Sequence, residues 1–387
     1  MPRVLIVVNH AAYLVSHRLA LIKKIISSKN HLKIVKGSAS SKLMEKKAIQ
    51  ILKKNKISFK TLPFSSTSKN FIKDIISIIS LVGEILRFKP DLIHLISPKG
   101  IFIGGLSSRI SGFKKIIISV TGMGTIFLSK KGLVNSIVKF IFLFSLKIIL
   151  NHKEKKIIFQ NKDDLRDFKK IFKLKKNEVK IIPGSGADLN FFKQIKVNYK
   201  SKNVILPARP LVEKGIYEFI EAAKNLKKKY PDWNFCIAGS FDYKNPSTVP
   251  IETINYYVKK KIIKNLGFKS QKYIYSKASI ICLPSYREGF SKSLIDAAAS
   301  GIATVTTNVP GCRDAVLKNK TAFLVKAKTI IPLVNYLERL IKSEALRVKM
   351  GREAKKFAYK KFDVKNIVNQ TLIIYKKLNE KININSA

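Results

Sequence analysis

The sequence predicts an α/β fold made of two doubly wound domains, and three observations carry this prediction. The chain has 387 residues, which is long for one ordinary domain and suits two of middling size. Short apolar runs rich in Ile and Val alternate with segments of helical periodicity, a pattern typical of parallel sheets covered by helices. The same alternation occurs in both halves of the chain.

In the first half, the apolar runs do not alternate with polar residues, as expected of strands that are buried on both faces. Helical patterns lie between them, for example at residues 17–28, 74–87 and 163–172. We therefore expect a parallel sheet with strands at residues 4–8, 32–35, 92–96, 116–120, 157–160 and 179–182.

The second half repeats the pattern after a polar stretch at residues 193–203, which we interpret as a linker. Helical patterns at 215–230, 291–300 and 330–343 alternate with expected strands at 204–207, 235–238, 279–283, 303–306 and 323–325. A last helical segment, at 364–378, has no further strand to lead into, so we expect it to pack back on the first domain. The predicted division is residues 1–195, residues 196–365 and a C-terminal helix within residues 366–387.

Ligands of doubly wound sheets bind beyond the carboxyl ends of the strands. We therefore expect the two domains to face each other across a cleft, and we give most weight to the loops that follow strands.

The charge balance is strongly basic, with 75 Lys and Arg against 24 Asp and Glu and a net charge of +51. An AT-rich genome explains part of the lysine excess but not the shortage of Glu. A field of this size attracts nucleic acid, anionic lipid or phosphorylated substrates, and charge alone does not choose among them. The sequence carries no helix-turn-helix, zinc or RNA-sheet motif, which leaves nucleic-acid binding as the weaker interpretation.

The cysteines form no CxxC pair, so we expect buried free thiols and a reducing compartment for Cys236, Cys282 and Cys312. The first eight residues do not resemble a signal peptide. The longest apolar stretch, residues 134–150, is interrupted by Lys139 and Lys147. This makes it a poor membrane span, and either a buried or an interfacial helix fits it.

The strongest motif is LPSYREGFSKSLIDAAASG at residues 283–301. It predicts a strand end, a turn and a helix, with Glu288 in the turn and Asp296 about two turns into the helix. Anions bind readily to the amides of a helix N-terminus, here those of Gly289, Phe290 and Ser291. An ordinary strand, loop and helix with solvated charges is the alternative.

This segment resembles the E-x7-E signature of glycosyltransferase family 4. In that family the first acid contacts the donor sugar and the second usually holds the ribose. The resemblance gives these roles to Glu288 and Asp296, the second acid being one methylene shorter than usual. It continues through TTNVPGCRDAV at residues 306–316 and covers nearly the whole chain, most specifically residues 204–326.

A second motif, PARPLVEKG at residues 207–215, resembles the Gly-Arg-Leu-x-x-x-Lys-Gly stretch of the same family. Arg209 and Lys214 match its diphosphate-binding pair, directly after an expected strand. Negative charge grows on the outer phosphate as the glycosidic bond breaks, and two fixed cations lower that barrier without a metal ion. Glu213 is interpreted as a structural charge at the start of the next helix.

The first domain carries weaker signals. Its opening loop at residues 9–19, NHAAYLVSHRL, lacks G-x-G-x-x-G, which counts against an NAD or FAD enzyme. The Ser-His-Arg stretch resembles bacterial family members that act on lipid-linked sugars, which makes His17 a candidate acceptor contact. A histidine that caps or packs at a helix start is an equal alternative. His94 is interpreted as a core residue and Asp188 as a structural one.

The loop TGMGTIF at residues 121–127 follows an expected strand. It resembles the loop that approaches the donor phosphates in the same bacterial subset, which suggests Gly122 and Gly124 as donor contacts and Thr121 on the acceptor side. It has no histidine where many family members place one, so no catalytic histidine is carried over.

The resemblance implies the GT-B fold, two Rossmann-like domains with the acceptor on the N-terminal side and the donor nucleotide-sugar on the C-terminal side. It also implies a retaining, metal-independent hexosyltransferase. The catalytic residues would be Glu288, Arg209 and Lys214, in a front-face displacement that needs no obvious general base. No Asp-x-Asp motif is present.

The leading hypothesis is a bacterial enzyme of surface-glycan assembly, such as capsule, O-antigen of lipopolysaccharide or a glycoprotein glycan. The donor would be a UDP-sugar, plausibly of an N-acetylhexosamine, and the acceptor a polyprenyl-diphosphate-linked sugar. The protein would be cytoplasmic and peripheral on the inner face of the cell membrane, drawn to anionic lipid. A UDP-sugar 2-epimerase shares the architecture, but it needs acid–base residues that the first domain barely offers.

Overall fold

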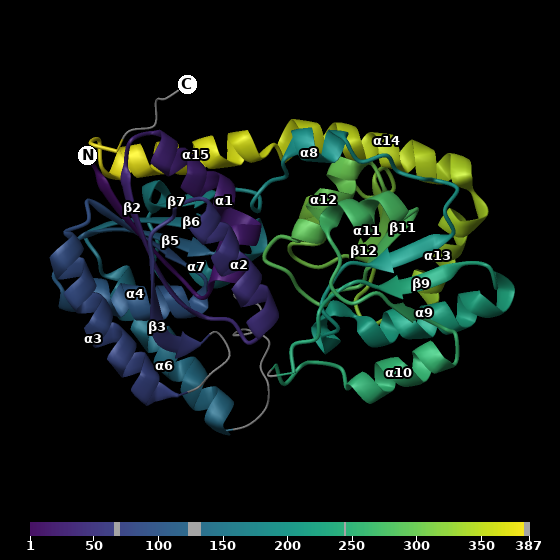
Figure 1. The fold of residues 1–387 in the computed structure, drawn as a ribbon, viewed down its shortest axis with the longest axis horizontal. Coiled ribbons are helices and arrows are strands. Elements are labelled where there is room, and N and C mark those ends of the chain that lie inside the picture. The colour runs from purple at the N-terminus through teal and green to yellow at the C-terminus, as the bar shows by residue number, and fades with distance from the viewer. Residues whose placement is uncertain (66–69, 123–132, 244, 383–387) are drawn as a thin grey trace. The chain divides into compact units, whose positions relative to one another are not determined.

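The computed structural model describes residues 1–65, 70–122, 133–243 and 245–382. The chain divides into two compact units (Figure 1). The first unit comprises residues 1–182 with those from 365 onward, and the second is Pro183–Val364. Residues 183–195, which the sequence assigned to the first domain, belong to the second unit because Phe192 and Ile195 lie in its core.

The described part of the first unit contains a parallel seven-stranded sheet of order β3-β2-β1-β4-β5-β6-β7. Its central strands are almost wholly buried, which explains their unbroken apolar runs. The strands are β1 (Arg3–Val8), β2 (His31–Ser38), β3 (Phe59–Ser65), β4 (Leu92–Ile96), β5 (Lys115–Val120), β6 (Glu154–Phe159) and β7 (Val179–Ile181).

Helices cover both faces of this sheet, because right-handed crossovers place α1 and α2 on one face and α3, α4 and α6 on the other. α1 begins earlier than residue 17, where the sequence predicted it. The reason is a cap, since His10 Nδ1 accepts a hydrogen bond from the Tyr13 amide at 3.1 Å. The helices are α1 (Ala11–Ser27), α2 (Lys42–Lys54), α3 (Phe71–Phe88), α4 (Pro98–Ile110), α6 (Leu133–Leu150), α7 (Lys162–Lys169) and the 3-10 turn η1 (Lys176–Glu178).

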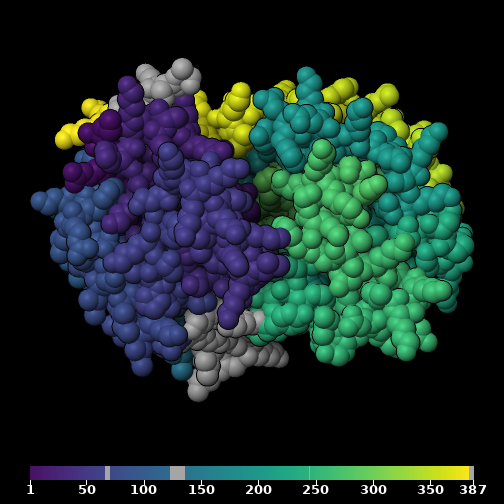
Figure 2. Space-filling model, in the orientation of Figure 1, coloured from purple at the N-terminus to yellow at the C-terminus, as the bar shows by residue number. Residues whose placement is uncertain are grey.

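The last helix, α15 (Val364–Leu378), packs on the first unit. Tyr375 is fully buried there, and its hydroxyl lies 2.6 Å from His94 Nδ1. Further along, the Asn379 side-chain amide donates to the Asp91 carbonyl at 2.9 Å. Figure 2 shows these C-terminal residues in yellow beside the purple N-terminal ones. The chain therefore returns to its first unit after completing the second.

The second unit holds a parallel six-stranded sheet of order β10-β9-β8-β11-β12-β13. Its strands are β8 (Asn203–Leu206), β9 (Asn234–Ile237), β10 (Lys264–Asn265), β11 (Ile280–Leu283), β12 (Ala303–Thr307) and β13 (Ala322–Val325). Its helical elements are α8 (Leu189–Lys193), η2 (Val212–Lys214), α9 (Ile216–Lys229), α10 (Ile251–Lys259), α11 (Gln271–Lys277), α12 (Lys292–Ser300), η3 (Arg313–Ala315), α13 (Ile331–Lys342) and α14 (Glu344–Lys361).

All three cysteines are free and buried, which confirms the prediction from the sequence. Burial raises the pKa of the Cys236 thiol to about 11 and that of Cys312 to about 12, so both are protonated at neutral pH. Among the helices that the structure describes, none combines the length and apolarity that crossing a bilayer requires.

Candidate functional site

Four loops of the second unit meet at one edge of its sheet. They follow β8, β9, β11 and β12, which are neighbours in the sheet and run parallel, so their carboxyl ends lie together. The loop after β8 carries Arg209 and Lys214, and the loop after β11 carries Glu288. Both sequence motifs therefore come to the same place.

Glu288 is held from two sides. Its Oε1 accepts a hydrogen bond from Lys214 Nζ at 2.5 Å and another from Ser285 Oγ at 2.8 Å. The Glu288 side chain is 14% exposed and that of Lys214 is 22% exposed, so the pair is partly open to solvent. A carboxylate and an ammonium thus lie in contact at the carboxyl edge of the sheet.

Two glycines allow this contact to form. Gly215, after Lys214, has a φ of +74°, and a Cβ there would lie 2.2 Å from the Pro284 carbonyl oxygen. Gly311 has a φ of +75°, and a Cβ there would lie 2.4 Å from the Glu288 carbonyl oxygen. Any side chain at either position would push the loops apart.

Arg209 is oriented by a residue that the sequence analysis did not identify. Arg209 Nη1 donates to Asp242 Oδ2 at 2.6 Å, and this carboxylate is 1% exposed while the guanidinium side chain is 44% exposed. Asp242 lies in the loop after β9, and its place after an expected strand was the available signal. The buried carboxylate fixes one end of Arg209 and leaves much of its side chain accessible.

The start of α12 differs in part from expectation. Ser291 caps the helix, with its Oγ accepting from the Leu294 amide at 3.4 Å. The Ser291 amide was predicted to face an anion. It is instead used inside the protein, donating to the Gly311 carbonyl at 3.0 Å, so this part of the prediction was wrong. The Phe290 ring is 9% exposed and packs edge-on against Phe362, anchoring the turn.

Asp296 is buried within a polar cluster on α12. It accepts from Gln271 Nε2 at 2.7 Å and is ion-paired with Lys292, one turn before it. Burial raises the pKa of Asp296, and the nearby Lys292 ammonium works against that increase. Lys292 and Gln271 are further residues that the sequence analysis did not single out.

The structure describes three of the four predicted residues of the first unit. Thr121 and Gly122 follow β5 directly, and Gly122 has a φ of +117°. Gly124 lies outside the described residues. His17, inside α1, stacks on the Tyr13 ring with centroids 4.4 Å apart, and its Nδ1 lies 2.7 Å from Ser16 Oγ.

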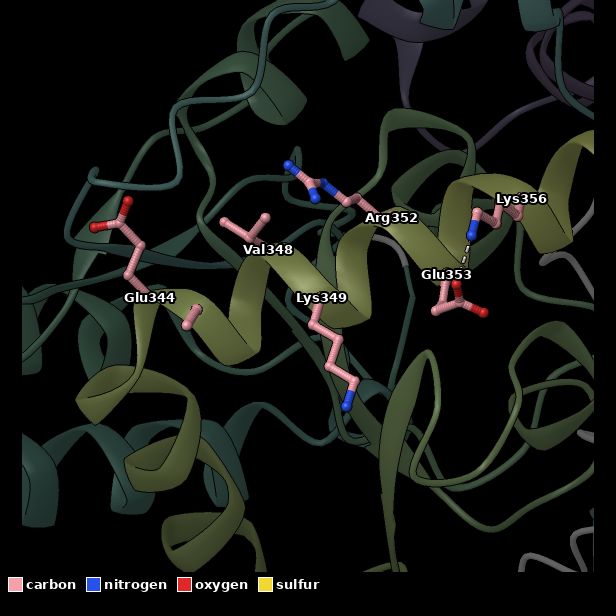
Figure 3. Close-up of a pocket in the computed structure, with 7 residues that line it drawn as sticks. Glu344, Val348, Lys349, Arg352, Glu353 and Lys356 are labelled. Atoms are coloured by element: carbon pink, nitrogen blue, oxygen red, sulfur yellow. Dashed lines mark hydrogen bonds and ion pairs between the residues drawn. The ribbon is translucent and has the colours of Figure 1, made fainter.

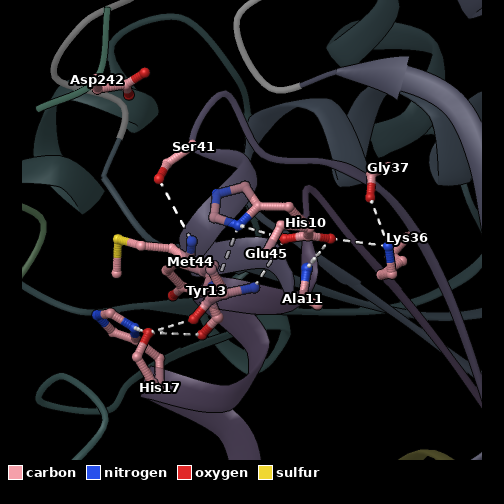
Figure 4. A network of polar contacts seen from close by, with 12 residues as sticks. His10, Ala11, Tyr13, His17, Lys36, Gly37, Ser41, Met44, Glu45 and Asp242 are labelled. Atoms are coloured by element: carbon pink, nitrogen blue, oxygen red, sulfur yellow. Dashed lines mark hydrogen bonds and ion pairs between the residues drawn. The ribbon is translucent and has the colours of Figure 1, made fainter. Parts of the chain in front are cut away.

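The N-terminus of α1 carries its own carboxylate. Glu45 Oε1 accepts from the Ala11 amide at 3.1 Å, and Oε2 accepts from the Ala12 amide at 3.2 Å. Lys36, which is 1% exposed, donates to the same carboxylate at 2.8 Å (Figure 4). Glu45 therefore takes the position where a dinucleotide-binding turn would hold a pyrophosphate, consistent with the absence of G-x-G-x-x-G.

Three interpretations made from the sequence concern structural residues. His94 is buried between Ser119 Oγ, 2.7 Å from its Nε2, and Tyr375, and this burial lowers its pKa well below the ordinary value. Asp188 caps α8 by accepting from the Phe191 amide at 3.1 Å. Glu213 lies in η2, and its carbonyl accepts from the amide of Tyr286, in the loop after β11, at 2.9 Å. The core and structural interpretations of His94 and Asp188 are confirmed.

A hollow on the surface of α14 lies apart from the predicted site. This shallow hollow is lined by one helix alone, where Lys356 pairs with Glu353 at 3.0 Å (Figure 3). None of the predicted site residues lines it. Over the described stretches of the chain, no group of three or more His, Cys, Asp or Glu residues is arranged to hold a metal ion.

Two protein families match this chain, one in each unit. The family described as Glycosyl transferase 4-like matches residues 3–161. The family described as Glycosyl transferases group 1 matches residues 188–357, which includes Arg209, Lys214, Glu288 and Asp296.

Two curated relatives are similar over most of their length. The chain is 27% identical to the N,N'-diacetylbacillosaminyl-diphospho-undecaprenol alpha-1,3-N-acetylgalactosaminyltransferase of Campylobacter jejuni, covering 81% of this chain and 84% of that protein. It is 25% identical to the UDP-Gal:alpha-D-GlcNAc-diphosphoundecaprenol alpha-1,3-galactosyltransferase of Escherichia coli, covering 72% and 73%.

A solved structure shares the fold. Anabaena HepE in complex with UDP and glucose matches with a TM-score of 0.76 and 15% identity, covering 97% of this chain and 100% of that one. This likeness establishes that the two α/β units form the GT-B architecture expected from the sequence.

Proposed function

We propose that this chain is a glycosyltransferase that glycosylates a lipid-linked sugar. Its first part matches the family described as Glycosyl transferase 4-like, and its second part matches the family described as Glycosyl transferases group 1. The donor is a UDP-sugar, plausibly of an N-acetylhexosamine, and the acceptor is a sugar on a polyprenyl diphosphate in surface-glycan assembly. Support comes from the two relatives, whose names specify undecaprenyl-diphosphate sugars and, in one case, a UDP-linked donor.

The observation that carries this proposal is the meeting of two cations and two carboxylates at one sheet edge. Lys214 and Arg209 are each held by a carboxylate, Glu288 and Asp242, and each remains partly exposed. A donor diphosphate binds to these cations in the same loops. Glu288 then contacts the donor sugar, and Asp296 holds the ribose.

The proposed reaction is a front-face displacement. The bond between the sugar C1 and the outer phosphate oxygen breaks, and the acceptor oxygen bonds to C1 on the same face. The acceptor proton passes to an oxygen of the departing phosphate, so the products are the glycosylated acceptor and UDP. Arg209 and Lys214 stabilise the charge that develops on the phosphate, a role that preorganised cations fill without a metal ion.

On the acceptor side we propose Thr121 and His17, with Gly122 beside the donor phosphates. Gly122 supports this role because its φ of +117° lets the backbone approach a ligand closely. The enzyme is proposed to work peripherally at the cytoplasmic face of the membrane, where its acceptor lies. Both relatives named above are transferases by name, which favours transfer over the epimerase alternative.

The test is a comparison of nucleotide binding at fixed ionic strength, by thermal shift with UDP, GDP, ADP and NAD. A nucleotide at a hundred times its dissociation constant adds about 2.7 kcal/mol of stability. We expect selective stabilisation by UDP, lost in Arg209→Ala. Because that change leaves the buried Asp242 without its partner, Arg209→Ala/Asp242→Asn serves as the matched control, and it too should lose UDP binding while folding normally. Equal shifts with all four nucleotides would contradict the proposal.

A further inference from the structure

Large apolar side chains are exposed together on two helices of the first unit. On α3, Ile72 is 71% exposed and Ile79 is 67% exposed, and on α6 Phe140 is 69% exposed. The other members are Phe71, Ile75, Ile76, Leu86, Ile137 and Phe144. We call this set the α3–α6 face. Such a concentration is unusual for a water-facing surface and marks an interaction site.

The fold places both helices on the outer side of one layer. α4 packs against α3 and against α6 and is itself largely buried, with small residues at the contacts. A Cβ on Gly105 would lie 2.6 Å from Ile149 of α6, and Ser107 Oγ donates to the Ile78 carbonyl of α3 at 3.1 Å. Figure 1 shows α3, α4 and α6 together, on the side of the sheet away from α15. The α3–α6 face is therefore one surface of the first unit.

The solvent-exposed charged residues of these two helices are all basic. The two acids of α3, Asp74 and Glu84, are 4% and 2% exposed. Asp74 pairs with Lys99, and Glu84 with lysines of the sheet and with Arg87. The sequence of α6 contains no acid. The exposed charged residues are basic, namely Lys73, Arg87 and Lys147.

We propose that the α3–α6 face docks on an anionic lipid surface. Its isoleucines and phenylalanines enter the boundary between headgroups and acyl chains, while the lysine stems lie along the apolar surface and keep their ammonium groups among the phosphates. A second copy of this chain is the less favourable occupant. Two such faces would bring basic residues together in a protein of net charge +51.

The position of the face suits a lipid-linked acceptor, and this step rests on the proposed function. α3 follows β3 and α6 follows β5, so both helices begin at the carboxyl edge of the sheet. Thr121 and Gly122 leave the same edge directly after β5. Most of the exposed apolar residues lie in the first half of α3 and in α6 before residue 145. Docking here would bring that edge close to the lipid that carries the acceptor.

The test is sedimentation of the full chain with vesicles of phosphatidylglycerol and phosphatidylcholine, or of phosphatidylcholine alone. We expect binding to the anionic vesicles that weakens with salt but is not abolished. Each isoleucine that enters the membrane should increase the vesicle partition coefficient roughly tenfold. We therefore expect Ile75→Ser/Ile79→Ser to bind the anionic vesicles at least about tenfold more weakly than the wild type. The control is Ile331→Ser/Tyr256→Ser, two exposed apolar residues of the second unit, which should bind as the wild type does.

The depth to which the α3–α6 face enters the membrane is measured with a fluorescent tryptophan. The one native tryptophan, Trp233, is 6% exposed and lies in the second unit. Phe140→Trp places an indole on the α3–α6 face, and brominated lipids should quench it. Tyr243→Trp, at a position 74% exposed in the second unit, should not be quenched.

Several results would overturn the proposal. The proposal fails if the wild type does not bind anionic vesicles, or if Ile75→Ser/Ile79→Ser binds them as well as the wild type does. It also fails if Ile331→Ser/Tyr256→Ser loses as much binding as the isoleucine variant, or if brominated lipids do not quench Phe140→Trp. A stable dimer that Ile75→Ser/Ile79→Ser dissociates would assign the face to a second copy. Transfer to a short-chain acceptor in detergent separates the two proposals, because docking variants should retain it. Wild type that binds vesicles but transfers no sugar would refute the function and leave the surface in place.

Discussion

At the scale of single residues, the candidate site contains two ion pairs between a cation and a carboxylate. Lys214 contacts Glu288 at 2.5 Å, and Arg209 contacts Asp242 at 2.6 Å. Each pair satisfies a carboxylate that would be costly to leave alone at its level of burial. The two cations are therefore already oriented for the diphosphate that we propose they bind, which would leave less reorganisation for the reaction itself.

Lys214→Met tests this arrangement. Removing one preorganised charge from a developing anion typically costs about a hundredfold to a thousandfold in turnover, so we expect kcat to fall by roughly that factor with normal folding. The measurement is UDP release under saturating donor. Lys224→Met is the control, since Lys224 is a 50% exposed lysine paired with Glu221 on α9, and it should leave turnover unchanged. Normal turnover in Lys214→Met would remove Lys214 from the site.

Asp296→Asn tests the ribose contact. Losing one charge-assisted hydrogen bond should raise the donor KM about tenfold, with kcat nearly unchanged because the contact is the same in ground and transition states. The raised pKa of Asp296 adds a signature in pH. The carboxylate is lost as pH falls through that pKa, so the wild-type donor KM should rise on acidification while that of Asp296→Asn stays flat. Parallel pH profiles would make Asp296 a structural residue of α12.

At the scale of elements, the sequence predicted the strands buried on both faces, such as β4 and β11, and also β7, an edge strand that is only partly buried. β3 was missed because it is an edge strand whose residues alternate in burial and include Lys60 and Pro63. β10 was missed because two exposed residues carry no periodicity. Edge pairing depends on the neighbouring strand, which a local pattern does not report.

The candidate site likewise contains residues that the sequence predicted and residues that it missed. Motif residues after β8 and β11 were predictable, because buried strands fix where their loops emerge. The partner of Arg209 was not predicted, since Asp242 lies five residues beyond β9 in an irregular loop. The Ser291 amide was misjudged because its acceptor, the Gly311 carbonyl, comes from the loop after another strand.

The last helix makes a prediction about stability. Tyr375 of α15 is fully buried and lies 2.6 Å from His94 Nδ1. Tyr375→Phe leaves that buried nitrogen unsatisfied and should destabilise the first unit by about 1–3 kcal/mol, measured by urea unfolding. UDP affinity should stay unchanged, because the residues proposed to bind the nucleotide diphosphate lie mainly in the second unit. Tyr256→Phe, at a position 56% exposed, is the control. Unaltered unfolding in Tyr375→Phe would show that α15 is not held through this contact.

At the scale of the whole molecule, the two units have similar folds but differ in the charged groups at the carboxyl edges of their sheets. Both units are parallel sheets with loops at their carboxyl edges. In the first, Glu45 accepts hydrogen bonds from the amides at the N-terminus of α1 and is paired with Lys36. These amides are therefore not open to a phosphate. In the second, the corresponding edge presents Arg209 and Lys214. This asymmetry supports the proposal that the donor binds to the second unit and the acceptor to the first.

The most direct test of the central claim is sugar transfer itself. UDP-sugars, beginning with UDP-N-acetylgalactosamine, are incubated with a short-chain polyprenyl-diphosphate sugar, and product mass, released UDP and anomeric configuration are measured. We predict one UDP released for each sugar transferred, an α-linked product from the α-linked donor, and loss of the product in Lys214→Met. No product with any UDP-sugar, or a β-linked product, would contradict the account.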